Sequence, residues 1–232
     1  MPAPLVIFDL DGTLLDTAPD LLRALNTVLV EQGLAPVDRA AVEFNFGHGA
    51  KALILEGFRR AGRPLAPEAT EPLVLRFLEL YGSGYAIDTR PFPGALAAMD
   101  RLARRGVRLA VCTNKRAHLA VPLLAALGLD RHFAAVIGGD SLKVRKPDPG
   151  HILGTIEAAG ALPRSSVMIG DSDADIAAAK GAGVPVVAVS FGYSPEPVET
   201  FSPDAVIDSY DDLETALVRV SPAFRACLAE RS

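Results

Sequence analysis

The sequence predicts an α/β fold, in which a Rossmann-like parallel sheet carries helices on both faces and a small α-helical cap domain is inserted into the chain. Three observations lead to this fold class. Short apolar runs recur along the chain, helix-like segments of about 10 to 15 residues separate them, and about 95 residues lie between the first run and the second. The runs are continuous rather than alternating, which is typical of parallel strands buried on both faces.

Six apolar runs are the predicted strands. They lie at residues 5–8, 107–112, 134–139, 166–170, 184–190 and 205–208. The predicted helices of the sheet domain lie at residues 95–105, 116–127, 149–160, 173–182 and 210–219. Because strands and helices alternate, we expect a parallel sheet with helices packed on its two faces.

The long gap after the first strand holds more chain than one crossover helix needs, so it should form a second unit. Three segments within it carry apolar residues at spacings of three and four, which predicts a small helical bundle. These segments lie at residues 18–33, 50–62 and 70–82. A proline-rich return at 88–94 leads back to the sheet. We therefore expect a core domain at 1–16 and 89–232 and a cap domain at 17–88.

The composition is that of a globular protein with ample material for a core. Of the 232 residues, 50% are hydrophobic and 22% are charged, and the net charge of −5 indicates no basic surface for nucleic acid or for an anionic membrane. Cys112 and Cys227 form neither a disulfide framework nor a metal-binding pattern, which fits a reducing compartment. No segment resembles a signal peptide or a membrane span, so we expect a cytoplasmic protein. As for its oligomeric state, both a monomer and a homodimer are compatible with the sequence.

Polar residues gather at the ends of the predicted strands. In an open α/β sheet, the carboxyl ends of the strands form the ligand-binding edge. Four chain segments bring polar side chains to this edge: Asp9 and Asp11; Thr113 and Asn114; Lys146; and Asp171, Asp173 and Asp175. Carboxylates that share a small site must either bind protons more tightly or recruit a cation.

The residue types at this edge suit a hard metal ion. Oxygen ligands without a convergent histidine or cysteine favour Mg²⁺, which keeps water ligands and shares oxygens with a substrate. Lys146 adds a fixed positive charge, and Thr113 adds a hydroxyl. Carboxylates, a divalent ion, a lysine and a hydroxyl in one crevice predict phosphoryl transfer, in which positioning and charge neutralisation supply most of the catalysis.

Four motifs carry a resemblance to a known family. They are "DLDGT" at 9–13, "VCTNK" at 111–115, "KPDP" at 146–149 and "GDSDAD" at 170–175. In order and spacing they resemble the motifs of the haloacid dehalogenase superfamily, and the helical insertion resembles its helical cap. Within that superfamily, "VRKPDP" and "FGHGAKAL" look most similar to the phosphoglycolate phosphatase branch. The resemblance implies a Mg²⁺-dependent phosphatase acting on a small phosphorylated metabolite, with 2-phosphoglycolate as the first choice.

The resemblance also implies roles for the acidic residues. Asp9 would attack phosphorus and form an aspartyl-phosphate, while Asp11 would act first as general acid and then as general base. Mg²⁺ would be held by Asp9, the backbone carbonyl of Asp11, and Asp171. Asp175 would not bind the ion itself but would hold the metal ligands in place.

Substrate contacts are implied at two places. In the core, Gly12 would allow a tight turn, and Thr113 and Lys146 would bind phosphate oxygens with help from Asn114. In the insertion, the "FGHGAK" loop would either present donors to the substrate or form an ordinary turn between cap helices. The residues of this loop that we assign to the substrate are Gly47, His48, Gly49 and Lys51.

Other functions fit parts of the same pattern. A sugar-phosphate mutase similar to β-phosphoglucomutase would return the phosphoryl group to a sugar hydroxyl. A receiver-type switch module, which accepts a phosphoryl group without turnover, also places carboxylates, Mg²⁺, threonine and lysine at the end of a parallel sheet. The large insertion favours an enclosed metabolite, and therefore an enzyme. Carbon–halogen hydrolysis is disfavoured, because it needs neither the acid at Asp11 nor the metal site.

Simpler explanations exist for individual residues. Asp9 and Asp11 would also suit a charged turn after a strand, and Thr113 would suit a helix cap. Asp173 is most simply an exposed or helix-capping residue. Three histidines lie away from the motifs and are expected to be surface or packing residues: His118, His132 and His151.

Overall fold

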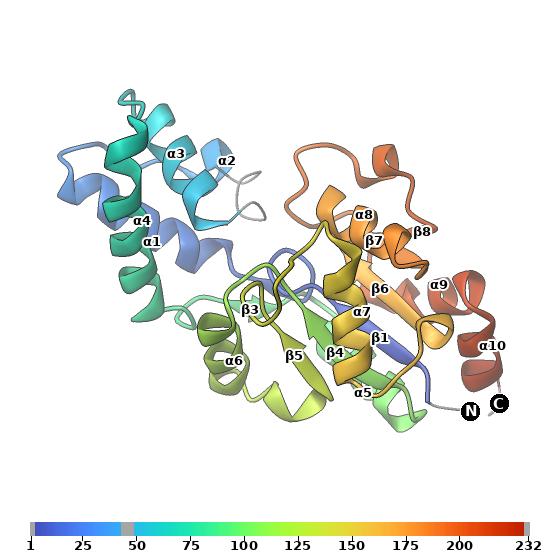
Figure 1. Cartoon of the computed structure of the whole chain (residues 1–232). Helices are drawn as coiled ribbons and strands as arrows, with labels where there is room; N and C mark the ends of the chain where they lie inside the picture. The colour runs from blue at the N-terminus through green and yellow to red at the C-terminus, as the bar shows by residue number, and fades with distance from the viewer. Residues whose placement is uncertain (1–2, 43–48, 230–232) are drawn as a thin grey trace. The chain divides into compact units, whose positions relative to one another are not determined.

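The computed structural model describes residues 3–42 and 49–229 of the chain. The chain divides into two compact units, Met1–Leu15 with Pro91–Ser232, and Asp16–Arg90 (Figure 1). The first unit contains the parallel sheet, and the second is inserted after the first strand. Over the described ranges, none of the helices has the length and apolar character that a membrane span requires.

The first unit is built around a parallel six-stranded sheet. Its strands are β1 (Leu5–Phe8), β4 (Arg108–Cys112), β5 (Ala135–Ile137), β6 (Ser166–Gly170), β7 (Val186–Val189) and β8 (Ala205–Ile207). They lie in the order β5-β4-β1-β6-β7-β8, so β1 is central and its two neighbours come from later in the chain. Each strand falls within a predicted apolar run, which confirms the predicted parallel sheet.

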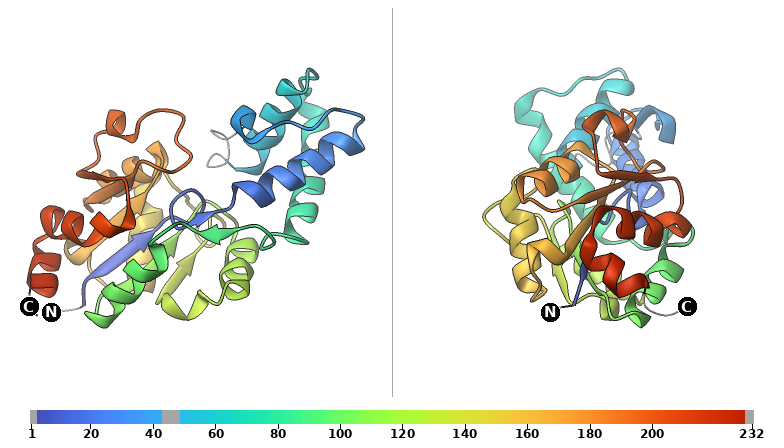
Figure 2. Two further views of the ribbon diagram at one scale, coloured as in Figure 1. Left: turned by 180° about the vertical axis from the view of Figure 1, so that it is seen from behind. Right: turned by 90° about the vertical axis from the view of Figure 1, so that its right-hand side faces the viewer.

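Helices cover both faces of the sheet, as predicted (Figure 2). On one face α7 (Pro149–Ala158) packs against α8 (Asp173–Gly181), and on the other α5 (Ala95–Arg104) contacts α9 (Leu213–Val220). The remaining helical elements of this unit are α6 (Ala117–Ala126), α10 (Pro222–Ala229), η2 (Asp130–His132), η3 (Pro163–Ser165), η4 (Val198–Phe201) and η5 (Tyr210–Asp212).

Alternate side chains of β1 enter the two layers of the core. Leu5 and Ile7 join a buried cluster with Ile152 of α7, whereas the ring of Phe8 lies 6.4 Å from that of Tyr210. Each fully buried apolar side chain of this size contributes about 1.5–3 kcal/mol. Burial on both faces explains the continuous apolar run and leaves polar groups to the end of the strand.

The second unit is a small helical bundle. In the part of this unit that the structure describes, the helices are α1 (Ala18–Glu31), α2 (Arg39–Val42), α3 (Ala50–Arg60) and α4 (Pro67–Gly82). α1 packs against α3 and α4, and a Cβ added to Gly57 of α3 would lie 2.7 Å from the side chain of Leu25 in α1. The three longer helices correspond to the predicted helical segments, whereas α2 has no counterpart in the prediction.

A buried carboxylate ties the entry of the second unit to its exit. Asp20 of α1 accepts hydrogen bonds from the backbone N–H of Thr89 at 2.9 Å and from its hydroxyl at 2.7 Å. Burial opposes ionisation of Asp20, but its hydrogen bonds, including one from Arg23, hold its pKa below the ordinary value. The chain enters and leaves this unit through two short strands that pair with each other, β2 (Leu15–Asp16) and β3 (Arg90–Pro91).

Candidate active site

Asp9 stands at the carboxyl end of the central strand. Its backbone N–H donates to the carbonyl of Ile169 at 2.9 Å, so pairing with β6 fixes its backbone. The chain then turns at Gly12, which has a φ of +83° and where a Cβ would lie 2.4 Å from a carboxylate oxygen of Asp171. Glycine is therefore required for the turn that follows the strand.

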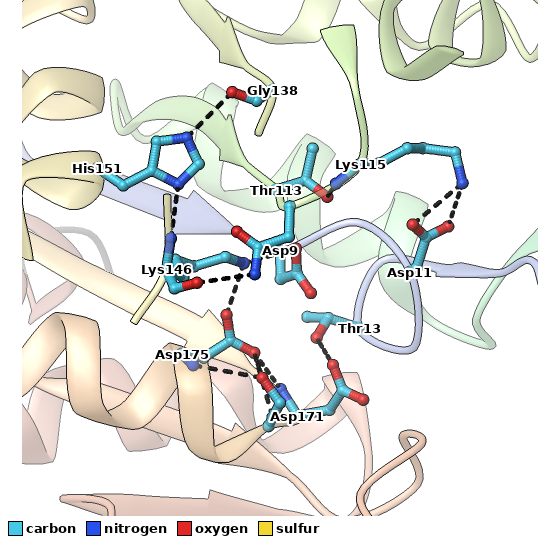
Figure 3. A network of polar contacts seen from close by, with 12 residues as sticks. Asp9, Asp11, Thr13, Thr113, Lys115, Gly138, Lys146, His151, Asp171 and Asp175 are labelled. Carbon is cyan, nitrogen blue, oxygen red and sulfur yellow. Dashed lines mark hydrogen bonds and ion pairs between the residues drawn. The ribbon is translucent and has the colours of Figure 1, made fainter. Parts of the chain in front are cut away.

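The side chain of Lys146 reaches toward Asp9 and Asp175 (Figure 3). Its Nζ is 2.7 Å from Oδ1 of Asp9 and 2.6 Å from Oδ1 of Asp175, and the residue is only 3% exposed. Burial lowers the pKa of a lysine, but the two carboxylates outweigh this effect and hold the pKa of Lys146 above its ordinary value. The side chain is therefore a permanent cation at the end of the strand.

Three buried carboxylates lie close together, and two of them, Asp9 and Asp175, contact this cation. Asp9, Asp171 and Asp175 each place an oxygen within 4.8 Å of the other two. Burial, reinforced by Asp175 and Asp9, raises the pKa of Asp171 to about 8. Burial also raises the pKa of Asp9 to about 6, although Lys146 opposes the rise. One lysine does not neutralise three carboxylates, so this oxygen-only donor set fits a hard divalent ion such as Mg²⁺.

Two neighbours fix the orientation of Asp171. One of its oxygens accepts a hydrogen bond from the Thr13 hydroxyl at 2.7 Å, and the other accepts one from the backbone N–H of Tyr193 at 2.7 Å. The loop after β7 approaches this closely because residue 192 is a glycine, whose added Cβ would lie 2.2 Å from the Cβ of Asp171. Thr13 belongs to the first motif, but no sequence signal points to the loop that carries Gly192 and Tyr193.

Both carboxylate oxygens of Asp175 have polar partners. Oδ1 pairs with Lys146, and Oδ2 accepts hydrogen bonds from the backbone N–H groups of Asp171 and Ser172 and, at 2.6 Å, from the Ser172 hydroxyl. Ser172 and Asp175 also form the capping box that starts α8. These contacts hold the loop that carries Asp171, and the role of Asp175 beside the metal ligands stays a prediction.

Asp11 has a different partner from Asp9. Its two carboxylate oxygens lie 2.8 and 3.0 Å from Nζ of Lys115, whose side chain is only 5% exposed (Figure 3). The cluster of three carboxylates does not include the side chain of Asp11. Lys115 has no role in the prediction from sequence, although its position directly after Thr113 and Asn114 is a signal that points to the same edge.

Thr113 and Asn114 follow β4, which runs beside β1. The Thr113 hydroxyl accepts a hydrogen bond from the backbone N–H of Lys115 at 3.1 Å, which leaves its proton available as a donor. Nδ2 of Asn114 donates to the backbone carbonyl of Lys146 at 2.9 Å. The structure therefore brings both residues to the edge that carries the lysine, and their contacts with phosphate stay predictions.

His151 corrects one expectation from the sequence. The prediction that it lies away from the motifs was wrong, because α7 starts directly after the lysine motif and its first turn faces Lys146. The ring is fully buried, with Nδ1 3.3 Å from the backbone nitrogen of Lys146 and Nε2 3.1 Å from the carbonyl oxygen of Gly138. His118 and His132 are partly exposed, as expected.

The predicted substrate loop of the insertion is described only in part. Gly49 precedes α3 with a φ of +89°, and Lys51 is an exposed residue in the first turn of that helix. Gly47 and His48 lie outside the described residues. The role of this loop in substrate binding therefore stays a prediction.

The parallel sheet and the buried centre of aspartates and lysine place the chain in the class of Rossmann-like α/β proteins with a polar site at the carboxyl edge of the sheet. The sequence pattern of the family described as haloacid dehalogenase-like hydrolase matches residues 6–189. The chain belongs to this family, which confirms the resemblance carried by the four motifs.

Relatives match the chain over almost its whole length. It is 46% identical over 215 residues to the phosphoglycolate phosphatase of Agrobacterium fabrum, which covers 93% of this chain and 92% of that protein. It is 45% identical over 213 residues to the phosphoglycolate phosphatase of Caulobacter vibrioides, which covers 92% and 90%. A crystal structure described as that of a predicted phosphoglycolate phosphatase from Haemophilus somnus superposes with a TM-score of 0.84 at 30% identity, covering 93% of this chain and 98% of that one. The similarity therefore includes the inserted unit as well as the sheet.

Proposed function

We propose that the chain is a Mg²⁺-dependent phosphatase, a phosphoric monoester hydrolase that acts on a small phosphorylated metabolite, with 2-phosphoglycolate as the leading substrate. The observation that carries this proposal is the Lys146 ammonium held between Asp9 and Asp175 inside an acidic cluster. Phosphoryl transfer needs both features, since cationic donors neutralise the phosphoryl oxygens while a carboxylate attacks phosphorus. The relatives named phosphoglycolate phosphatase support the same substrate.

The proposed reaction has two steps. In the first, the Asp9 carboxylate attacks phosphorus, the bond from phosphorus to the substrate oxygen breaks, and Asp11 gives a proton to the departing alkoxide. The Thr113 hydroxyl and the Lys146 ammonium bind the phosphoryl oxygens during this step. In the second step, Asp11 takes a proton from a water molecule, which attacks the aspartyl-phosphate and releases inorganic phosphate and free Asp9.

The residues proposed to hold Mg²⁺ are Asp9, the backbone carbonyl of Asp11, and Asp171. When bound, the ion would supply charge neutralisation for the carboxylates and for the phosphoryl oxygens. The chain fixes the orientation of the Asp171 carboxylate, because Thr13 donates a hydrogen bond to one of its oxygens and the backbone N–H of Tyr193 donates to the other.

Lys115 favours a substrate that carries a second anionic group. Its buried ammonium binds both oxygens of the Asp11 carboxylate. For Asp11 to serve the leaving alkoxide, this ion pair has to open, and another carboxylate can then replace Asp11 on Lys115. The carboxylate of 2-phosphoglycolate has this chemistry, whereas the ester of an uncharged alcohol lacks it.

Replacing Lys115 with methionine should therefore raise the KM for 2-phosphoglycolate by about tenfold or more, because a hydrogen bond to a charged group is lost. The KM for ethyl phosphate, which has no carboxylate, should change by less than about threefold. Steady-state kinetics with both substrates measures the difference, and Arg116→Met in the exposed neighbouring residue is the matched control. Equal increases for the two substrates would contradict a role in carboxylate recognition.

Phosphate release from a panel of phosphate monoesters, with Mg²⁺ and with excess chelator, tests the proposed function. We expect steady release of inorganic phosphate from 2-phosphoglycolate, and we expect the chelator to stop it. An isomerised sugar phosphate without phosphate release would identify a mutase instead. A stoichiometric, long-lived phosphoryl label without turnover would identify a receiver-type switch module.

A further inference from the structure

We propose that Asn114 and His151 are positioning residues that clamp the backbone of Lys146 and so align its ammonium group between Asp9 and Asp175. The inference rests on the proposed function, in which Lys146 binds the phosphoryl oxygens. It gives a role to a histidine that lies outside the four motifs.

Lys146 lies in the turn between β5 and α7, in chain that belongs to no strand or helix. Side chains take up its two backbone polar groups. The Lys146 N–H points to Nδ1 of His151 at 3.3 Å, and the Lys146 carbonyl accepts a hydrogen bond from Nδ2 of Asn114 at 2.9 Å. Asn114 follows β4 and His151 belongs to α7, so two separate elements hold one residue from both ends of its backbone.

The hydrogen bonds of His151 fix the tautomer of the ring. A backbone N–H only donates and a backbone carbonyl only accepts. Nδ1 must therefore turn a lone pair to the Lys146 N–H, and Nε2 must donate its proton to the carbonyl of Gly138, 3.1 Å away. Burial lowers the pKa of His151, which agrees with a neutral ring. An imidazolium ring in this place would have no acceptor for Lys146.

With the clamp, both the backbone and the side chain of Lys146 are held in place. Its backbone is held at two points, and its Nζ is held at 2.7 and 2.6 Å by Asp9 and Asp175. A misplacement of about 1 Å in a group that binds the reacting atoms can cost about 100-fold in rate. Lysine has a long and flexible side chain, so its alignment depends on how firmly its backbone is held.

Two variants of His151 separate the clamp from simple packing. His151→Asn keeps an amide oxygen near the place of Nδ1, where it can accept the Lys146 N–H, whereas His151→Gln keeps an amide near Nε2 and loses that acceptor. We expect kcat to fall by less than about fivefold in His151→Asn and by about 30- to 100-fold in His151→Gln. The inhibition constant of inorganic phosphate should rise only in His151→Gln, because product binding also depends on Lys146.

Further variants complete the test. Asn114→Leu removes the other arm of the clamp at similar size and should lower kcat as His151→Gln does. His132→Gln is the matched control, because His132 lies on η2, is partly exposed and contacts none of the site residues described above. Thermal unfolding reports whether each variant is folded. If His151→Gln shows no cooperative transition, His151→Met, which also lacks an acceptor at the place of Nδ1, takes its place in the comparison with His151→Asn.

Equal values of kcat for His151→Asn and His151→Gln, or a wild-type kcat in Asn114→Leu, would overturn the clamp. The failure of the proposed function has a different signature, because it would show as the absence of phosphate release from the wild-type chain with any monoester. A merely structural role of His151 would lower the unfolding temperature of both variants while leaving their kcat values and phosphate inhibition constants alike, and this result would also overturn the clamp.

Discussion

Replacing Asp9 with asparagine is expected to abolish steady phosphate release, with a loss of about 10⁴-fold or more. An amide does not attack phosphorus as a carboxylate does, so no aspartyl-phosphate forms. A continuous assay of inorganic phosphate with 2-phosphoglycolate measures the loss. Asp173→Asn is the matched control, because Asp173 lies in the fourth motif but is exposed. Turnover in Asp9→Asn at the wild-type rate would reject Asp9 as the nucleophile.

The same variant should remain folded, and its stability should depend on pH in a defined direction. Burial raises the pKa of Asp9 to about 6, above the value of 3.8 for an unperturbed aspartate. The folded wild type therefore binds more protons than the unfolded chain between these values, so its free energy of unfolding falls as the pH rises. Without metal, Asp9→Asn should unfold a few degrees above the wild type at about pH 8 and close to it at about pH 4. A lower unfolding temperature at about pH 8 would contradict this electrostatic account.

Replacing Lys146 with methionine is expected to remove both activity and stability. Asp9 and Asp175 would lose the cation that lies 2.7 and 2.6 Å away, and the pKa of Asp9 would rise further without it. Breaking a buried ion pair by removing one partner costs about 3–5 kcal/mol, so the free energy of unfolding should fall by that amount. Urea unfolding without metal measures the change, and phosphate release should fall by about 100-fold or more.

Lys143→Met is the matched control for this experiment. Lys143 precedes Lys146 by three residues in the same segment but is exposed, so its removal should change neither stability nor turnover. If Lys143→Met and Lys146→Met gave the same small effect, the buried ammonium would have no part in the reaction.

The sheet was predictable because its strands are buried on both faces. β1 has four fully buried residues and β6 has five buried residues, so each strand reads as a continuous apolar run. The pairing of β2 with β3 was not predictable, because strands of two residues carry no periodic pattern. Helix α2, with four residues, is too short for a periodic signal of its own.

The site residues that could be predicted from the sequence are those that directly follow a strand. Asp9 and Asp171 follow the neighbouring strands β1 and β6, so topology alone brings them together. The pairing of Asp11 with Lys115 and the contact of His151 with Lys146 depend on how loops fold back beyond the strands. The motifs place Lys115 and His151 near this edge, because Lys115 directly follows Asn114 and His151 lies two residues after the lysine motif, but their spacing does not show which groups pair.

The strand pair at the ends of the second unit has a consequence for protein engineering. Paired strands lie about 5 Å apart, so excision of the insertion would leave two cut ends that a very short linker can rejoin. A foreign helical bundle with the same spacing between its termini could be grafted in its place. Asp9 and Lys146 both belong to the unit that would stay untouched. We therefore expect that the insertion can be exchanged while the residues around Asp9 and Lys146 stay unchanged.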